Sequence, residues 1–300
     1  MGARGSKLAR AQARIVQDAL QSLCGIATEL IAIRTSGDRL QGPLSEAGGK
    51  GLFIKELEEA LWSGQIDLAI HSMKDVPAPL PEGMSIAAVL PREDPRDAFV
   101  SNHAGRLEDL AAGARIGTCS VRRAAQIARL RPDLAIVPLR GNVDTRLAKL
   151  AAGEIDAIIL AIAGLRRLGL DAYATCLLPT ESWLPALAQG TIGIEMLERD
   201  SRAESIGAAL NDHAAAAALA CERAFQAALG GSCRSPIAGL ATIVNGILRF
   251  RGEVLAPDGA SSVDTRVELA LGDNAVAEAA AAGHEAGMAI KPHAQAWLAV

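Results

Sequence analysis

The first two thirds of the chain alternate short apolar runs with amphipathic segments. Several runs are apolar without a break, which is typical of strands buried on both faces of a parallel or mixed sheet. The runs predict strands over residues 26–35, 66–71, 85–90, 97–101, 114–118, 134–141, 156–163 and 191–196. Helical periodicity predicts helices over 7–23, 51–64, 121–130 and 143–152. The pattern therefore predicts an α/β fold.

Two segments interrupt this alternation and divide the chain. PREDPRD (91–97) reads as a crossing between two units, and a second break falls near LPTESWLPALAQG (178–190). The run at 191–196 can then return to the first sheet. The tail differs: an Ala-rich helix over about 203–229, a strand, turn and strand over 241–259, a third strand over 261–271 and a last Ala-rich helix. It predicts a smaller α+β unit.

Composition excludes several classes of protein. The net charge of −4 gives no reason to expect nucleic-acid binding, and no apolar run approaches the roughly 20 residues of a membrane span. The N-terminal residues lack the apolar core of a secretory signal. The five cysteines are scattered without a CxxC pair, which argues against a zinc site or a disulfide framework. We expect a reduced, cytoplasmic protein without nucleic-acid or membrane partners.

Arginine is used far more than lysine, with 24 Arg against 6 Lys. Between residues 115 and 167 there are nine Arg and one Lys against four acidic residues. Such a bias suits fork-shaped recognition of carboxylate or phosphate groups. The alternative interpretation is a solvated basic face.

Polar segments follow the predicted strands where ligands bind in open α/β sheets. They are RTSGD (34–38), HSMKD (71–75), GTCSVRR (117–123), LRGNVDTR (139–146) and AGLRR (163–167). Helices follow several of them, so free backbone N–H groups are expected to point at the same space. An anion-binding cleft fits this arrangement. There is no phosphate loop, GxGxxG or HExxH motif, and the histidines lack metal-ligand spacing.

Cys233 lies in the loop GGSCRSP, where glycines allow unusual backbone angles and Arg234 favours a thiolate. From the residues alone, it can be an unreactive loop thiol or a nucleophile paired with His71. The second interpretation describes a thiol enzyme. A third describes a solute-binding protein, because such proteins also place two α/β lobes around a cleft.

Seven segments resemble, in order and spacing, motifs of the porphobilinogen deaminase family, also called hydroxymethylbilane synthases. They are GGKGLFIKELE (48–58), HSMKDVP (71–77), REDPRDAFVS (92–101), GTCSVRRAAQ (117–126), RPDLAIVPLRGNVDTRLAKL (131–150), DAIILAIAGLRRLGL (156–170) and GGSCRSPI (230–237). The similarity runs in register over residues 2–240. It implies a transferase of porphyrin and heme biosynthesis. Such enzymes join four porphobilinogen molecules head to tail, release ammonia at each step and hydrolyse off the linear tetrapyrrole hydroxymethylbilane.

The resemblance also implies site residues. The catalytic carboxylate is Asp75, and a dipyrromethane cofactor is bound covalently through a thioether to Cys233. The other residues implied to bind the cofactor are Asp38, Ser72, Lys74, Thr118, Ser120, Arg122, Arg123, Arg140 and Arg146. Those implied to bind substrate are Arg4, Ser6, Lys50, Phe53 and Arg167. No metal is expected.

The implied architecture is a monomer of three domains: two doubly wound, mixed-sheet α/β lobes similar to type II periplasmic binding proteins, and a small α+β C-terminal domain. Domain 1 spans residues 1–91 with 191–207, domain 2 spans 96–185, and domain 3 spans 212–300. Some positions depart from the family pattern. Little of the first strand precedes Arg4, Cys119 stands where serine is common, and Glu46 stands where some members carry a lysine.

Overall fold

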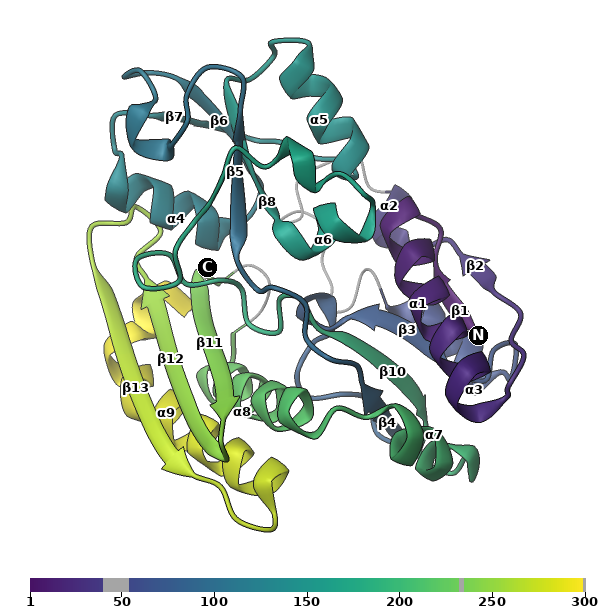
Figure 1. Cartoon of the computed structure of the whole chain (residues 1–300). Coiled ribbons are helices and arrows are strands. Elements are labelled where there is room, and N and C mark those ends of the chain that lie inside the picture. Colours follow the sequence, from purple (N-terminus) through teal and green to yellow (C-terminus); the bar gives the residue numbers. More distant parts are fainter. Residues whose placement is uncertain (40–53, 232–234, 299–300) are drawn as a thin grey trace.

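The computed structural model describes residues 1–39, 54–231 and 235–298. Its N-terminal lobe is built on a five-stranded sheet in the order β2-β1-β3-β10-β4 (Figure 1). The strands are β1 (Gly2–Arg4), β2 (Ile31–Ile33), β3 (Ala69–Ser72), β4 (Met84–Val89) and β10 (Ile192–Leu197). β1 runs parallel to β2 and β3, whereas β10 runs antiparallel between β3 and β4. The predicted return of residues 191–196 to the first sheet is confirmed.

The helices of the N-terminal lobe within the described residues are α1 (Lys7–Cys24), α2 (Ser36–Arg39), α3 (Lys55–Trp62) and α7 (Arg202–Leu210). Helix α1 begins where the Ser6 side chain accepts a hydrogen bond from the backbone of Ala9, and it ends at Gly25 in the left-handed conformation. Its apolar face buries Val16 and Leu20 against the sheet. Strand β1 is as short as the sequence suggested, yet it lies between β2 and β3.

The second lobe contains another five-stranded sheet, in the order β7-β6-β8-β5-β9. Its strands are β5 (Asp97–Ser101), β6 (Arg115–Gly117), β7 (Ala135–Val137), β8 (Ala157–Ala161) and β9 (Cys176–Leu177). Its helices are α4 (Val121–Leu130), α5 (Val143–Ala151) and α6 (Ile162–Arg167), with short 3₁₀ turns η2 (Leu107–Asp109) and η3 (Asp171–Tyr173). The strand predicted over 156–163 was too long, because α6 starts directly after β8.

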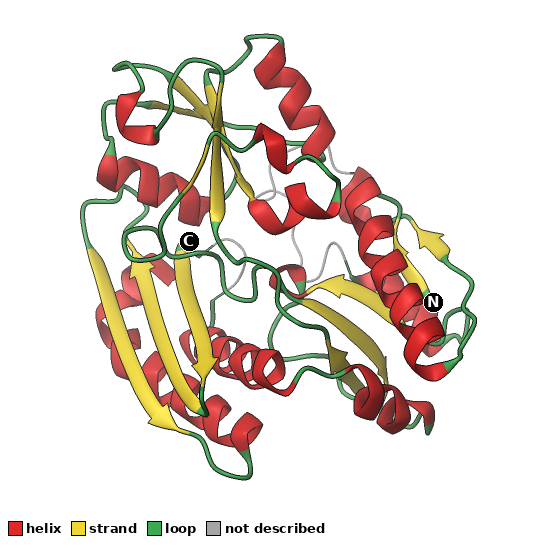
Figure 2. Cartoon of the chain, viewed as in Figure 1, coloured by secondary structure: helices red, strands yellow, loops and turns green. Residues whose placement is uncertain are grey.

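The C-terminal unit is an antiparallel sheet of β11 (Ile237–Val244), β12 (Ile247–Leu255) and β13 (Ser262–Ala270). Helices α8 (His213–Leu229) and α9 (Ala275–Leu298) cover one face of it (Figure 2). Phe225 and Phe250 meet edge to face in its core, with ring centroids 4.9 Å apart. The single helix predicted over 203–229 was wrong. It is divided into α7 and α8, because Asp212 caps a new helix by accepting from the backbone of Ala215.

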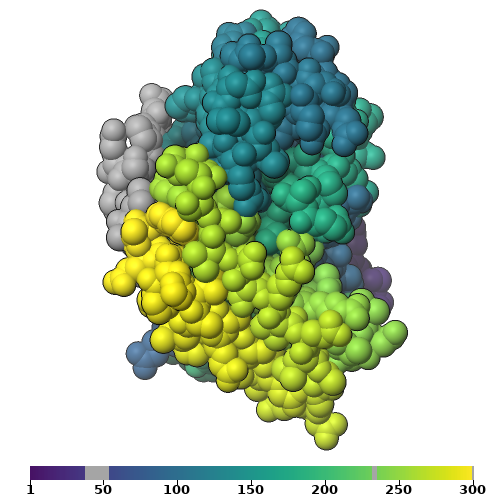
Figure 3. All heavy atoms as spheres, turned by 90° about the vertical axis from the view of Figure 1, so that its left-hand side faces the viewer, coloured from purple at the N-terminus to yellow at the C-terminus, as the bar shows by residue number. Residues whose placement is uncertain are grey.

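The C-terminal unit packs directly against the second lobe (Figure 3). One contact there is an ion pair between Arg129 of α4 and Glu253 of β12. The crossing segment between the lobes is held as well, since Arg92 pairs with the buried Glu222 of α8 at 2.7 Å. No helix in the described parts of the chain is both long and apolar enough to cross a membrane.

Candidate active site

A cavity of about 1200 Å³ lies where the two lobes and the C-terminal unit meet. Its walls come from the segments that follow the strands, and the first residues of α1, α4 and α5 open onto it. Many of the residues implied by the resemblance line this one cavity: Arg4, Ser6, Ser72, Lys74, Asp75, Ser120, Arg122, Arg123, Arg140, Arg146 and Arg167. The structure therefore brings together side chains from positions 4 to 167 of the chain.

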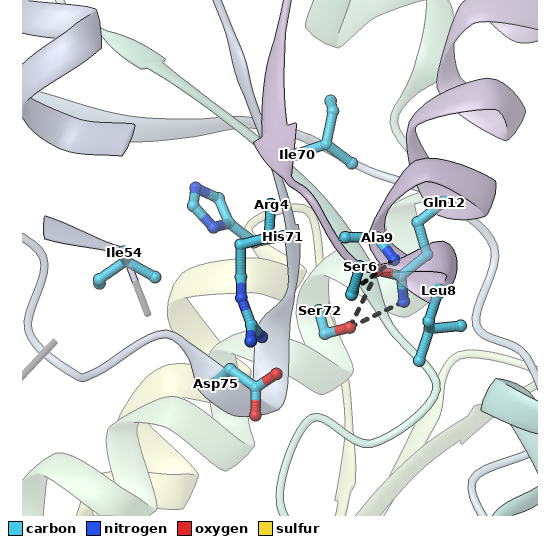
Figure 4. A pocket seen from close by; sticks show the side chains of 10 residues that line it. All are labelled: Arg4, Ser6, Leu8, Ala9, Gln12, Ile54, Ile70, His71, Ser72 and Asp75. Atoms are coloured by element: carbon cyan, nitrogen blue, oxygen red, sulfur yellow. Dashed lines mark hydrogen bonds between the residues drawn. The ribbon is translucent and has the colours of Figure 1, made fainter. Parts of the chain in front are cut away.

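Asp75 ends the short 3₁₀ turn η1 (Met73–Asp75), which follows directly from β3. Its carboxylate lines both the large cavity and an adjoining recess of about 60 Å³. In Figure 4, Arg4 extends from the end of β1 toward Asp75. Ser72 is held by a hydrogen bond from the amide of Gln12, 2.7 Å away on α1. The strand end therefore presents one carboxylate beside a fixed polar wall.

Lys74 reaches into the same cavity and donates a hydrogen bond to Oε1 of Gln189 at 3.2 Å. The cavity walls remove much of its hydration although the side chain faces open space. This desolvation lowers the pKa of Lys74 to about 8, while the neighbouring Asp75 opposes the shift. At neutral pH Lys74 is therefore protonated in most molecules, so Asp75 has a cation beside it.

Arg122 and Arg123, at the start of α4, have charges that are already paired. Both guanidinium groups are buried and donate to the fully buried Asp97, at 2.7 and 2.6 Å. Trp183 and Gln189 also donate to this carboxylate, each at 2.9 Å. Burial alone would raise the pKa of Asp97, but the two arginines hold it well below its usual range. Replacing either arginine is therefore expected to affect stability as well as binding.

Three other implied arginines, Arg140, Arg146 and Arg167, are available to a ligand. Arg146 donates to the carbonyl of Gly141 at 2.8 Å and Arg167 to that of Gly190 at 2.6 Å, so neutral acceptors fix their direction without cancelling their charge. Burial lowers the pKa of Arg146 and lowers that of Arg167 to about 10. Both remain cationic at neutral pH. Arg140 is half-buried on the same wall.

Three of the hydroxyl residues implied by the resemblance accept hydrogen bonds from nearby backbone N–H groups. Ser6 caps α1, and Ser120 caps α4 by accepting from the backbone of Arg123 at 3.4 Å. Thr118 is buried next to the cavity wall, where its hydroxyl accepts from the backbone N–H of Ser120 at 3.1 Å. Thr118 therefore supports the loop before α4.

The structure does not describe the side chains of some residues implied by the resemblance. Lys50, Phe53 and Cys233 lie outside the described residues. Asp38 belongs to α2, but its side chain is not among those described. On either side of residues 232–234, Gln226 and Ser235 line the large cavity.

His71 is buried and its Nε2 lies 2.9 Å from Oε2 of Glu195 on the neighbouring strand β10. It is thus engaged with a carboxylate, as a structural histidine would be. Within the described chain, no group of three or more His, Cys, Asp and Glu side chains could hold a metal ion.

Sequence reasoning missed several cavity residues. Gln12 and Gln189 orient Ser72 and Lys74, but a glutamine in a helix or loop carries no signal of its own. Three further cations that the resemblance did not imply also line the cavity: Lys7, Arg10 and Arg34. Of these, Arg34 lies in the strand-end segment 34–38 that the sequence had indicated. Lys7 and Arg10 could have been noticed, because they occupy the opening turn of a helix that has no acidic residue there.

Comparison with known proteins gives the same family over nearly the whole chain. Residues 1–205 match the model described as "Porphobilinogen deaminase, dipyromethane cofactor binding domain", and residues 216–291 match "Porphobilinogen deaminase, C-terminal domain". A porphobilinogen deaminase of Nitrobacter winogradskyi is 51% identical over 289 residues, covering 95% of this chain and 91% of the relative. One of Nitrobacter hamburgensis is 49% identical over 298 residues, covering 98% and 93%.

Among solved structures, a periplasmic substrate-binding protein of an ABC transporter from Coxiella burnetii matches 71% of this chain and 91% of its own. The identity is 13% and the TM-score 0.46. The sequence matches carry the assignment: they favour the enzyme over the solute-binding and thiol-enzyme interpretations. The chain belongs to the porphobilinogen deaminase family, and its first two lobes form the domain that binds the dipyrromethane cofactor.

Proposed function

We propose that this chain joins four porphobilinogen molecules head to tail into hydroxymethylbilane, with release of ammonia at each addition. We further propose that the dipyrromethane is attached through a thioether to Cys233. The observation that carries the proposal is the position of Asp75 in one cavity with cations from both lobes. Such a cavity suits a reaction in which positive charge develops on a ligand that bears many carboxylates.

The residues present fit the cofactor. Each pyrrole carries an acetate and a propionate group, and Arg140, Arg146 and Arg167 present cations to the same space. Backbone N–H groups at the starts of α4 and α5 add positive potential. When bound, dipyrromethane supplies the pyrrole carbon to which the first substrate is joined.

Asp75 is the proposed catalytic residue. Its carboxylate can accept hydrogen bonds from the N–H of a substrate pyrrole and lies where that ring gains positive charge as ammonia leaves. A fixed anion at such a point is the strongest device available to the site. The same carboxylate can take the proton from the ring carbon of the new bond and pass that proton to the amine that departs in the next addition.

Lys74 is proposed to bind a substrate carboxylate beside Asp75. Its hydrogen bond to Gln189 fixes the ammonium within the cavity. Arg4 and Ser6 complete the substrate side of the site, next to Asp75. From composition we also propose a cytoplasmic location, and from the family resemblance a monomer that acts on a small molecule alone.

Replacing Asp75 by Asn tests the proposal. The variant removes one charge from a side chain exposed to the cavity, so the fold and the unfolding midpoint should remain. Turnover of porphobilinogen should fall by at least about 100-fold. A matched control is Asp67→Asn, since Asp67 is an exposed carboxylate of the same lobe that pairs with Arg202. Unchanged turnover in Asp75→Asn would exclude the proposed role.

A further inference from the structure

Three cations that line the cavity are not among the site residues implied by the resemblance, and we call them the rim cations: Lys7, Arg10 and Arg34. Lys7 and Arg10 lie in the first turn of α1, and Arg34 follows the end of β2. All three side chains are exposed, and all three line the large cavity. They extend its positive lining from Arg4, beside Asp75, toward the outer edge of the N-terminal lobe.

The two cations in the first turn of α1 are unfavourable for the helix electrostatically. The N-terminus of a helix carries partial positive charge and favours acidic side chains. The first turn of α1 has no acidic residue and carries two cations instead. These cations are three positions apart in the sequence, so they are neighbours on the helix surface. Such local conflicts are expected at functional sites, where a ligand supplies the missing charge.

The charges of the rim cations are poorly compensated by the protein. Among described residues, neither Arg10 nor Arg34 has a carboxylate within ion-pair distance. Lys7 pairs with Asp144 of α5 at 3.0 Å, across the gap between the lobes, but the two side chains are 76% and 42% exposed. An exposed pair of this kind is worth little, so an incoming carboxylate can replace Asp144.

We propose that the rim cations bind the carboxylates of the lengthening product after the inner cations are occupied. This inference rests on the proposed function, because each joined substrate adds an acetate and a propionate. The inner arginines serve the cofactor and the first additions. Later additions push earlier units outward, and their carboxylates then need cations beyond Arg4. The rim cations are placed to receive them, with Lys7 released from Asp144.

The test is the double variant Arg10→Gln, Arg34→Gln, studied as cofactor-loaded protein by intact mass after mixing with limiting porphobilinogen. The first mass increment should form at nearly the wild-type rate. The last two should form about tenfold more slowly, which corresponds to about 1.4 kcal/mol shared between two exposed contacts. Short chains should therefore accumulate on the variant.

Arg14→Gln is the matched control. Arg14 is exposed on the same helix, one turn beyond Arg10, and is not part of the cavity wall. It should leave the mass distribution as in the wild type. A second readout without substrate is the unfolding midpoint, which should stay level or rise in the double variant because repulsion is relieved.

An unchanged mass distribution in the double variant, or equal slowing of every increment including the first, would overturn the inference. A fall in the unfolding midpoint would also count against it, since that result would give these arginines a structural role. If the wild type itself showed no stepwise mass gain, the proposed function would fail, and this outcome is distinguishable from the others.

Discussion

Asp75 and Asp97 are carboxylates of the same central region in opposite surroundings. Asp75 faces open cavity space, whereas Asp97 is fully buried and accepts hydrogen bonds from four side chains. The first is available to a ligand, and the second neutralises Arg122 and Arg123. The distinction separates the carboxylate suited to chemistry from the one that holds the lobe together.

Asp97→Asn should therefore be strongly destabilising. The substitution leaves two buried guanidinium groups without a counter-charge, which typically costs about 3–5 kcal/mol. The free energy of unfolding from urea titration should fall by that order. Asp109→Asn is the control, because Asp109 is an exposed carboxylate of the same lobe. A loss equal to the control would show that the buried pairs are not needed.

The proposed role of Lys74 as a carboxylate-binding cation predicts a pH dependence of the activity. Because desolvation lowers its pKa to about 8, the ammonium loses its proton as the pH rises through 8, and carboxylate binding weakens. The value of kcat/KM should therefore fall above pH 8, since this parameter reports groups of the free enzyme.

Lys74→Arg tests this assignment, because a guanidinium keeps its charge throughout this range. The alkaline fall in kcat/KM should move to higher pH in this variant, whatever its absolute activity. An alkaline limb at the wild-type position in Lys74→Arg would assign it to another group.

At the scale of elements, the first turns of α1 and α4 contribute to the cavity wall. Helices α1 and α4 begin at the cavity with serine caps and no acidic residue in the first turn. Helix α8 instead begins at Asp212, which is not part of the cavity wall. The sequence pattern did not separate this start from the preceding helical stretch. A run of alanines favours helix on either side, so only the cap marks the boundary.

Asp212→Ala should lower the free energy of unfolding by about 0.5–2 kcal/mol, the usual cost of losing a helix cap. The lost contact is the hydrogen bond from the backbone of Ala215 at 2.7 Å. Glu285→Ala on α9 provides a control at an exposed helical position. Equal denaturation midpoints for the two variants would show that the Asp212 cap does not stabilise α8.

The sequence predicted most of the elements because apolar runs and amphipathic periods are local signals. Helix α4 begins and ends as expected at 121–130, and β5 at 97–101. The strand-end segments also predicted the positions of Asp75 and Arg146. Asp97 and Gln189 were missed as partners because they lie 92 positions apart, and such contacts exist only after the lobes assemble.

At the scale of the whole molecule, the segment around Gln189 joins all three parts. Gln189 contacts Asp97 of the second lobe and Lys74 of the first. The backbone of the preceding residue, Ala188, donates to Glu222 of the C-terminal unit. Lys74, the cation beside Asp75, is thus positioned by contacts that require the complete fold. This junction also places residues 226 and 235, on either side of the proposed cofactor cysteine, at the same cavity.

The attachment of the cofactor is the central claim of this account, and intact mass tests it most directly. We would measure the mass of the purified protein and map the peptide that contains Cys233. The account predicts a dipyrrole adduct on Cys233 and on no other cysteine. An unmodified chain that also fails to gain mass when given porphobilinogen would contradict it.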